Sequence, residues 1–262
     1  MKALKLLFIG DIVGRPGRNI IKENLRNLIE ENNVDFVIAN GENAAGGNGI
    51  TKKIAEELFD AGINFFTMGN HVWDNKEIFS FIDTEERIIR PLNYPPGAPG
   101  KGSNIIEIKN NLKIGIINIS GRTFMQALDC PFRTCAEEIE KINKITNIIV
   151  VDFHAEATSE KQAMGWFLDG KVSLVVGTHT HVQTADERIL PKGTAYITDV
   201  GMTGAYDSIL GIDKDEVIKK FLNQLPARFE VASGRAQLNS VLVEIDEITG
   251  LAISIKRLNL LK

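Results

Sequence analysis

The stretch Val172-Ser173-Leu174-Val175-Val176-Gly177-Thr178-His179-Thr180-His181 decides the fold class. Its first half is a run of β-branched and apolar residues, which is typical of a strand buried on both faces in a parallel sheet. Its second half carries two of the chain's four histidines. In a strand, His179 and His181 would point to the same face, whereas in a loop they could converge on one metal ion or on two neighbouring ions. The stretch therefore predicts a buried strand that opens into a ligand site at its C-terminal end.

Composition favours one large α/β domain over two small ones. The chain has 262 residues, of which 44% are hydrophobic and 24% are charged. A chain of this size can bury a sizeable core, so we expect a single domain over residues 1–262. The 30 basic and 34 acidic residues give a net charge of −4, which argues against a stable nucleic-acid partner held on a broad basic surface. A phosphate substrate stays open, because metal ions could supply local positive charge.

The sequence predicts a soluble, cytoplasmic protein. Its first apolar run, Leu6 to Ile9, stops at Asp11 and is too short for a signal peptide. No stretch of the sequence approaches the roughly 20 apolar residues of a membrane span. Cys130 and Cys135 are expected to be reduced thiols, because disulfides are rare in the cytosol. We therefore expect no membrane partner, while a homo-oligomer is left open.

Strand and helix patterns alternate along the chain, as in α/β folds. The predicted strands are 4–9, 35–39, 63–68, 148–151, 171–176, 195–199, 238–245 and 251–258. The predicted helices are 17–32, 134–145, 158–168 and 213–223, with a shorter one at 75–82. Another short helix is expected to begin after Thr51 as its N-cap and to end at Gly62. Residues 103–108 and 112–119 are expected to form a hairpin with Asn110-Asn111 at its turn.

Polar residues that can bind metal ions follow five of the predicted strands. They are Asp11, Glu42 with Asn43, Asn70 with His71, His154, and the pair His179 and His181. All four histidines of the chain belong to this set. Each position alone is more often a turn or a packed side chain than a ligand. Their recurrence at C-terminal strand ends, which share one edge in an open α/β sheet, indicates a single ligand-binding site.

Carboxylate, amide and imidazole groups in one cluster suit a site for two divalent metal ions. Carboxylate oxygen and neutral imidazole nitrogen admit Fe, Mn or Zn, and we expect Fe or Mn ahead of Zn. The candidate set contains no thiolate, so a purely structural zinc site is disfavoured. Two ions about 3.5–4 Å apart need a bridging ligand, for which Glu42 is the natural carboxylate. A hydroxide between the ions would be nucleophilic at neutral pH.

These motifs resemble, in order, those of the calcineurin-like metallophosphoesterases and, more closely, those of the YmdB-like branch of bacterial phosphodiesterases. The matching stretches are Gly10-Asp11, Gly41-Glu42-Asn43, Gly69-Asn70-His71, His154, Gly177-Thr178-His179-Thr180-His181 and Thr198-Asp199-Val200-Gly201-Met202-Thr203-Gly204. The resemblance spans nearly the whole chain, from residue 4 to about 260. Two departures from the broad superfamily, Val13 in place of a histidine and Glu42 in place of a bridging aspartate, belong to the YmdB-like pattern.

The resemblance implies a four-layer α/β/β/α sandwich of two mixed sheets and a role for each motif residue. One metal ion would be held by Asp11, Glu42, Asn43 and His181, and the other by Glu42, Asn70, His154 and His179. His71, which follows a ligand, would stabilise the transition state or protonate the leaving oxygen. The branch is associated with hydrolysis of 2′,3′-cyclic nucleotides, which implies a small-molecule phosphodiester attacked in line by a metal-bridging hydroxide.

The residues leave several alternatives open. A phosphomonoesterase or a nuclease could use the same metal ions, and a regulatory protein could use the site only to bind a metal ion or a nucleotide. Arg15 and Arg18 could touch the substrate phosphate or lie in a solvated loop. Trp73 could stack against a base, although a packing role is favoured. The sequence does not indicate which residues bind the base and the ribose.

Overall fold

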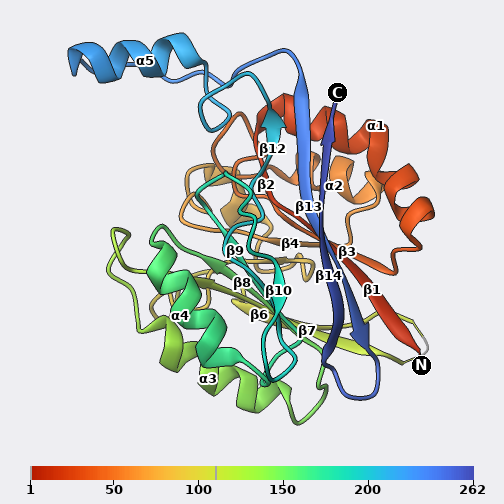
Figure 1. The fold of residues 1–262 in the computed structure, drawn as a ribbon. Helices are drawn as coiled ribbons and strands as arrows, with labels where there is room; N and C mark the ends of the chain where they lie inside the picture. Colours follow the sequence, from red (N-terminus) through yellow and green to blue (C-terminus); the bar gives the residue numbers. More distant parts are fainter. Residues whose placement is uncertain (1, 110) are drawn as a thin grey trace.

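The computed structural model describes residues 2–109 and 111–262, which form two mixed β-sheets packed face to face between two helical layers (Figure 1). One apolar core lies between the two sheets, a second lies between the first sheet and its helices, and a third lies between the second sheet and its helices. This arrangement confirms the predicted four-layer α/β/β/α sandwich. Asn110, half of the expected hairpin turn, lies outside the described residues.

The first sheet has eight strands. They are β1 (Ala3–Ile9), β2 (Asp11–Ile12), β3 (Phe36–Asn40), β4 (Phe65–Thr67), β5 (Ile88–Ile89), β12 (Met202–Ala205), β13 (Ala236–Asp246) and β14 (Ala252–Leu261). Their order is β2-β12-β13-β1-β3-β4-β5, with β14 paired to β13. Strands β1, β3, β4 and β5 are parallel, whereas β13 runs antiparallel to β1, β12 and β14.

The second sheet has six strands. They are β6 (Ser103–Glu107), β7 (Lys113–Ser120), β8 (Ile149–His154), β9 (Leu174–Thr178), β10 (Arg188–Ile189) and β11 (Ala195–Ile197). Their order is β10-β11-β9-β8-β7-β6, and β7, β8, β9 and β11 are parallel. The predicted antiparallel hairpin is present as β6 and β7. Strand β8 continues to His154, three residues beyond its predicted end.

Four helices cover the outer faces of the sheets. Helices α1 (Gly14–Asn32) and α2 (Lys52–Ala61) pack on the first sheet, and α3 (Pro131–Ile142) and α4 (Thr158–Leu168) pack on the second. Thr51 caps α2 as predicted, because its side chain accepts a hydrogen bond from the Ile54 N–H, and Gly62 ends that helix. The short helix predicted at 75–82 is a 3₁₀ helix, η1 (Lys76–Ser80). Among the described residues, no helix is both long and apolar enough to traverse a lipid bilayer.

Helix α1 begins three residues earlier than predicted, within the glycine- and proline-rich segment that was expected to be a loop. Pro16 is tolerated there because the N–H groups of a first helical turn have no partner inside the helix. Gly17 lets the helix lie directly on β12, since a Cβ at this position would be 2.2 Å from the Thr203 carbonyl oxygen. The local breakers therefore serve close packing of helix on sheet.

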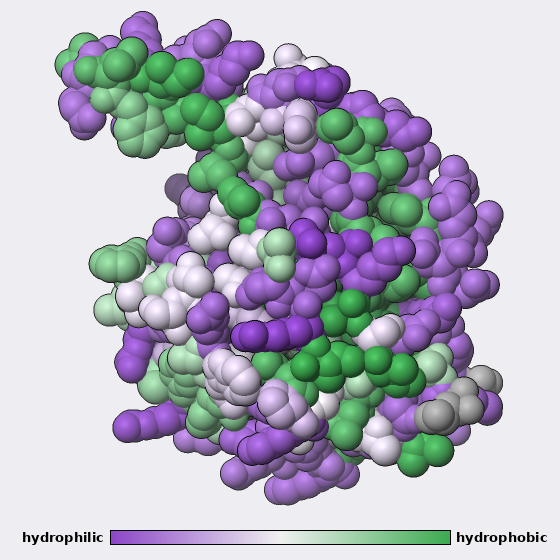
Figure 2. All heavy atoms as spheres, in the orientation of Figure 1, coloured by the Kyte–Doolittle hydropathy of each residue, from purple (hydrophilic) through white to green (hydrophobic). Residues whose placement is uncertain are grey.

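Helix α5 (Lys214–Asn223) projects from the sandwich instead of packing on a sheet (Figure 1). Asp213, predicted as its first residue, is its N-cap and accepts hydrogen bonds from the Asp215 and Glu216 N–H groups. Val217 is its one buried residue. Figure 2 shows apolar side chains on the surface of this arm, where Phe221 is 73% exposed.

The alternating side chains of β1 divide between two cores. Leu4, Leu6 and Phe8 face the core between the sheets, whereas Leu7 and Ile9 face α1 and α2. Because both faces of the strand are covered, its sequence is almost continuously apolar instead of alternating with polar residues. The core between the sheets fixes one sheet against the other and so sets the relative positions of the strand ends.

Phe8→Ala should lower the free energy of unfolding by about 3–5 kcal/mol, because the ring is fully buried between the sheets and its loss leaves a cavity. Phe221→Ala on the projecting arm is the matched control and should change stability by less than about 0.5 kcal/mol. Urea denaturation measures both changes. Equal effects of the two substitutions would contradict the core position of Phe8.

Candidate metal centre

Side chains from both sheets meet at the C-terminal ends of the parallel strands. In the first sheet, Asp11 begins β2, Glu42 follows β3 and Asn70 follows β4. In the second sheet, His154 ends β8 and His179 follows β9. The expectation that one open sheet edge would carry all of these residues is therefore wrong. The edges of two packed sheets contribute, and the loops after their strands converge above the core between them.

Glu42 lies at the centre of the cluster. Its Oε1 is 3.1 Å from His154 Nε2, and that nitrogen is 3.1 Å from His179 Nδ1. Asn70 Oδ1 lies 2.9 Å from the same His154 nitrogen. Donor atoms of Glu42, His154 and His179 all lie within 4.8 Å of one another, a spacing that one metal ion could span. The structure thus brings together the four residues assigned to one of the two ions.

The residues assigned to the other ion form a connected set of contacts that begins at Glu42. Asn43 Nδ2 is 3.3 Å from both Glu42 Oε1 and His181 Nε2. His181 Nε2 is 3.9 Å from Asp11 Oδ1. Asn43 turns its amide nitrogen toward the cluster, so binding a metal ion through Oδ1 requires the amide to rotate by half a turn. The other six predicted ligands are therefore gathered around the buried Glu42.

Each of the three histidines in this cluster has one ring nitrogen held by an acceptor outside it. The pairs are His154 Nδ1 with Thr178 Oγ1 at 2.9 Å, His179 Nε2 with Glu156 Oε2 at 3.2 Å, and His181 Nδ1 with the Leu210 carbonyl oxygen at 3.1 Å. When the ring N–H faces that acceptor, the second nitrogen presents its lone pair to the cluster. This pattern of outer hydrogen bonds is typical of histidines that bind metal ions.

The cluster concentrates negative charge that the protein alone compensates incompletely. Burial raises the pKa of Asp11 well above its usual value, and its Oδ1 has no hydrogen-bond partner among the described residues. Burial by itself would raise the pKa of Glu42, but the charge and hydrogen bond of His154 lower it to about 2. Glu42 in turn outweighs burial and raises the pKa of His154 to about 9. His154 thus supplies positive charge beside Glu42, and a metal ion would supply it for Asp11 as well.

The other two inward-facing histidines are held neutral. Burial, followed by the charge on His154, lowers the pKa of His179 to about 3, and burial also lowers the pKa of His181. Neutral imidazole is the form that binds metal ions. Buried carboxylate oxygens together with neutral imidazole nitrogens fit divalent ions such as Fe, Mn and Zn, so the residues present fit the group that the resemblance implies.

Both histidines of the Thr178–His181 loop have left-handed backbone conformations, with φ of 95° at His179 and 64° at His181. Such conformations cost of order 1–3 kcal/mol each in residues other than glycine. The loop interpretation of the sequence is thereby confirmed over the strand interpretation, since β9 ends at Thr178. The strained backbone allows two histidines separated by one residue to converge on the same cluster.

His71 is placed apart from the inward-facing ligands. Its backbone N–H donates to Glu42 Oε2 at 2.9 Å, while its ring is partly exposed. Ring nitrogen Nδ1 lies 2.7 Å from Asp74 Oδ2, and Nε2 makes no hydrogen bond within residues 2–109 and 111–262. The His71–Asp74 pair has the geometry of an oriented general acid. Asp74 was not predicted, although its position three residues after His71 could have indicated it.

Glycine at position 69 makes room for the cluster. A Cβ there would lie 2.3 Å from His154 Nε2 and 2.4 Å from Glu42 Oε2, so even alanine would occupy ligand space. The glycine of the Gly69-Asn70-His71 motif therefore has a steric reason that is independent of the turn it makes.

Several supporting residues have no signal in the sequence pattern. Asp152, inside β8, accepts from the Thr178 hydroxyl at 2.7 Å and so supports His154 through that hydroxyl. Glu156, which holds His179, is a partly exposed residue that any surface loop could carry. Of the open candidates, Arg18 donates to the Ala44 carbonyl oxygen. Trp73 stacks on Phe79 with ring centroids 5.2 Å apart, in agreement with the favoured packing role.

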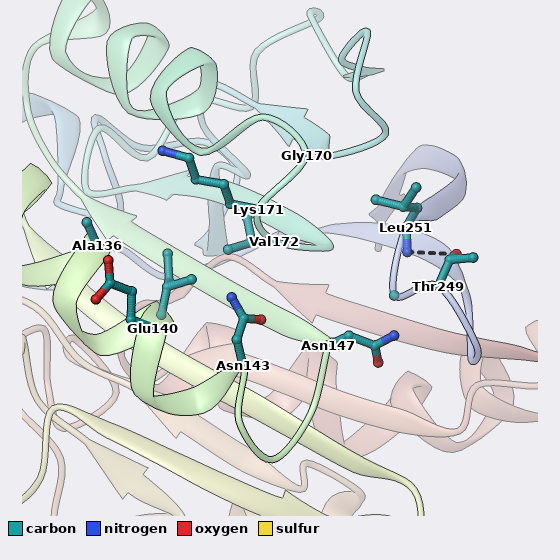
Figure 3. Close-up of a pocket in the computed structure, with 11 residues that line it drawn as sticks. Ala136, Glu140, Asn143, Asn147, Gly170, Lys171, Val172, Thr249 and Leu251 are labelled. Atoms are coloured by element: carbon teal, nitrogen blue, oxygen red, sulfur yellow. Dashed lines mark hydrogen bonds between the residues drawn. The ribbon is translucent and has the colours of Figure 1, made fainter.

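A cavity of about 350 Å³ has none of the predicted ligands in its lining. Figure 3 shows residues that line it. Its lining includes Asn143, Lys171 and Thr249, beside the starts of β8 and β9. The candidate metal centre lies at the opposite ends of these strands. A different groove, of about 620 Å³, borders His181 and is also lined by Tyr206 and Asn259.

Known proteins match this chain over nearly its whole length. A family model described as "YmdB-like protein" matches residues 7–258. A 2′,3′-cyclic-nucleotide 2′-phosphodiesterase of Bacillus subtilis (strain 168) is 53% identical over 255 residues, which cover 97% of this chain and 96% of that protein. A putative phosphatase/phosphodiesterase of Mycoplasma pneumoniae is 42% identical, covering 94% of this chain and 89% of that protein.

Solved structures share the architecture in detail. The crystal structure of a novel phosphatase from Mycoplasma pneumoniae superposes with a TM-score of 0.94 at 40% identity, covering 100% of this chain and 94% of that one. A hypothetical protein from Thermus thermophilus gives a TM-score of 0.93 at 40% identity, covering 99% of this chain and 100% of that one. With its motifs converged at one centre and its sequence matched by the family model over residues 7–258, the chain belongs to the YmdB-like family.

Proposed function

We propose that this protein is a metal-dependent phosphodiesterase that hydrolyses 2′,3′-cyclic nucleotides with two divalent metal ions. The observation that carries the proposal is the buried Glu42, whose Oε1 contacts Asn43 of one predicted ligand set and His154 of the other. A single carboxylate in contact with both candidate ligand sets is the arrangement that a two-metal site requires.

The relatives support the enzyme class and the substrate. Those at 53% and 42% identity are named for phosphodiesterase and phosphatase activities, so the chain is a hydrolase acting on phosphoester bonds. The Bacillus subtilis relative is named for 2′,3′-cyclic nucleotides, and we extend that substrate class to this chain. Carboxylate, amide and imidazole ligands admit Fe, Mn and Zn. For the metal ions we propose Fe or Mn ahead of Zn.

The residues divide the work of hydrolysis between binding and proton transfer. When bound, the metal ions would supply positive charge to the phosphate and lower the pKa of a water molecule for in-line attack. Asp11, Glu42, Asn43 and His181 would hold one ion, and Glu42, Asn70, His154 and His179 would hold the other. His71, oriented by Asp74, donates a proton from Nε2 to the ribose oxygen that leaves phosphorus when the cyclic diester opens.

The groove beside His181 offers the place for the nucleoside. Its volume of about 620 Å³ falls within the roughly 300–1,000 Å³ of small-molecule sites. Tyr206 presents a partly exposed ring on which a base could stack, and Asn259 presents an amide for hydrogen bonding. A small mononucleotide suits this groove better than a long nucleic acid, in line with the acidic net charge of −4.

A substrate panel tests the proposal. Protein purified anaerobically and loaded with Mn²⁺ or Fe²⁺ should open 2′,3′-cyclic AMP with a higher kcat/KM than it shows for 3′,5′-cyclic AMP, p-nitrophenyl phosphate or single-stranded RNA. Glu42→Gln is the matched control and should bind less metal and lose turnover. Turnover of a phosphomonoester or RNA without 2′,3′-cyclic AMP would favour the phosphatase or nuclease alternatives. Metal binding without any turnover would favour a binding module.

His71→Ala should lower kcat by about 10²- to 10⁴-fold, because it removes the proton donor, while two metal ions per chain remain bound. Metal content is measured by elemental analysis and kcat with 2′,3′-cyclic AMP. Asp74→Asn should give a smaller loss, since the ring stays and only its orienting partner changes. Loss of a metal ion from His71→Ala would show that His71 is a ligand and would refute the assigned role.

Glu156→Gln should weaken metal binding by about 10- to 100-fold, because the carboxylate fixes the ring of His179 and makes its other nitrogen a stronger ligand. Mn²⁺ titration calorimetry measures the affinity. Glu160→Gln is the control: it lies four residues along the chain, and its carboxylate accepts hydrogen bonds from the Arg122 and Thr123 N–H groups instead. Equal affinities in both variants would argue against the role of Glu156.

A further inference from the structure

A buried ion pair lies directly behind the loop that carries His179 and His181. Lys161, from α4, places Nζ 2.6 Å from Asp199 Oδ2, and the two side chains are 2% and 0% exposed. Neither residue belongs to the ligand cluster. A buried charge pair is costly unless further hydrogen bonds satisfy it, so its other contacts indicate what it supports.

Most of those contacts are to the ligand loop. Asp199 Oδ2 accepts from the Thr180 N–H at 3.1 Å and from the Thr180 hydroxyl at 2.6 Å. Lys161 Nζ also lies 3.4 Å from that hydroxyl. Thr180 is the residue between the two histidines. The ion pair therefore holds the midpoint of the segment whose left-handed turns present both imidazoles.

The same carboxylate reaches the other side of the metal centre. Asp199 Oδ1 accepts from the Gly201 N–H at 2.7 Å, and the Gly201 carbonyl accepts from the Asp11 N–H at 3.1 Å. The Met202 N–H in turn donates to the His181 carbonyl at 3.1 Å. One buried carboxylate thus connects the histidine loop with the strand β2 that carries Asp11, two parts of the chain far apart in sequence.

We propose that Asp199, with its charge neutralised by Lys161, is a positioning residue that sets His179, His181 and Asp11 at metal-binding distance. The proposal rests on the proposed function in one respect, because it takes these three residues as metal ligands. Both histidines have left-handed backbone conformations, which are strained. A strained loop keeps its shape only where neighbouring residues hold it, so this loop needs such a support. Lys161 pairs with Asp199 at 2.6 Å and is not itself one of the predicted ligands.

The test compares Asp199→Asn with Asp169→Asn. Asp169 is also buried. It lies at the end of α4 away from Lys161, and its carboxylate accepts a hydrogen bond from the Lys192 N–H. Mn²⁺ affinity is measured by titration calorimetry, and amide hydrogen exchange is measured on protein stripped with EDTA. Asp199→Asn should weaken Mn²⁺ binding by about 10- to 100-fold and speed exchange of the Thr180 amide at least tenfold. Asp169→Asn should change neither, even if it lowers the melting temperature as much.

Thr180→Val provides a second variant that keeps the fold if Asp199→Asn does not. It removes the hydroxyl contact alone and should weaken Mn²⁺ binding several-fold. Wild-type affinity in either the Asp199 or the Thr180 variant would overturn the proposal, as would equal loss of affinity in the Asp169 control. Failure of the wild-type protein to bind Mn²⁺ would overturn the proposed function instead. The hold of Asp199 on the Thr180 loop would still be tested in that case, because the exchange measurement is made without metal ions.

Discussion

Buried negative charge at the meeting point of two sheets is the constraint on which the rest of this structure depends. Four fully buried carboxylates lie within a few residues of the strand ends: Asp11, Glu42, Asp152 and Asp199. Ionised groups cannot be buried unless positive charge or several hydrogen-bond donors accompany them. Each carboxylate meets this need differently, and the differences separate the supporting residues from the ligands.

Two of the four carboxylates are satisfied by the protein itself. Asp199 has Lys161 and the donors of the histidine loop, and Asp152 has hydroxyl and amide donors. Glu42 accepts hydrogen bonds from the His71 N–H and the Asn43 amide and pairs with His154, whereas Asp11 keeps an oxygen without a partner among the described residues. Asp11 and Glu42 are the two carboxylates that face the cluster. Both carboxylates are held at the ends of short strands, and this fixed placement preorganises the site for cations.

Much of this could be predicted from the sequence, because the ligand residues follow apolar strands in short motifs. The helix at 158–168 and the Thr51 cap were predicted correctly, since periodicity and capping are local properties. Strand β12 was not predicted, because its Met202-Thr203-Gly204-Ala205 sequence lacks a strand pattern and it pairs with β2 across the chain. Glu156 and Lys161 were missed for the same reason: only the tertiary fold brings these charged residues to the histidine loop.

The division of the ligands between two sheets has a mechanical consequence. Asp11, Glu42 and Asn70 come from the first part of the chain, and His154, His179 and His181 come from its second half. Metal ions bound by both groups would link these two parts of the chain, in addition to the apolar core between the two sheets. Because ligands that bind only the native state stabilise it in proportion to the logarithm of their concentration, the melting temperature of this protein would report the metal supply of its surroundings. A cell short of metal would then hold a protein that is both less active and more easily unfolded.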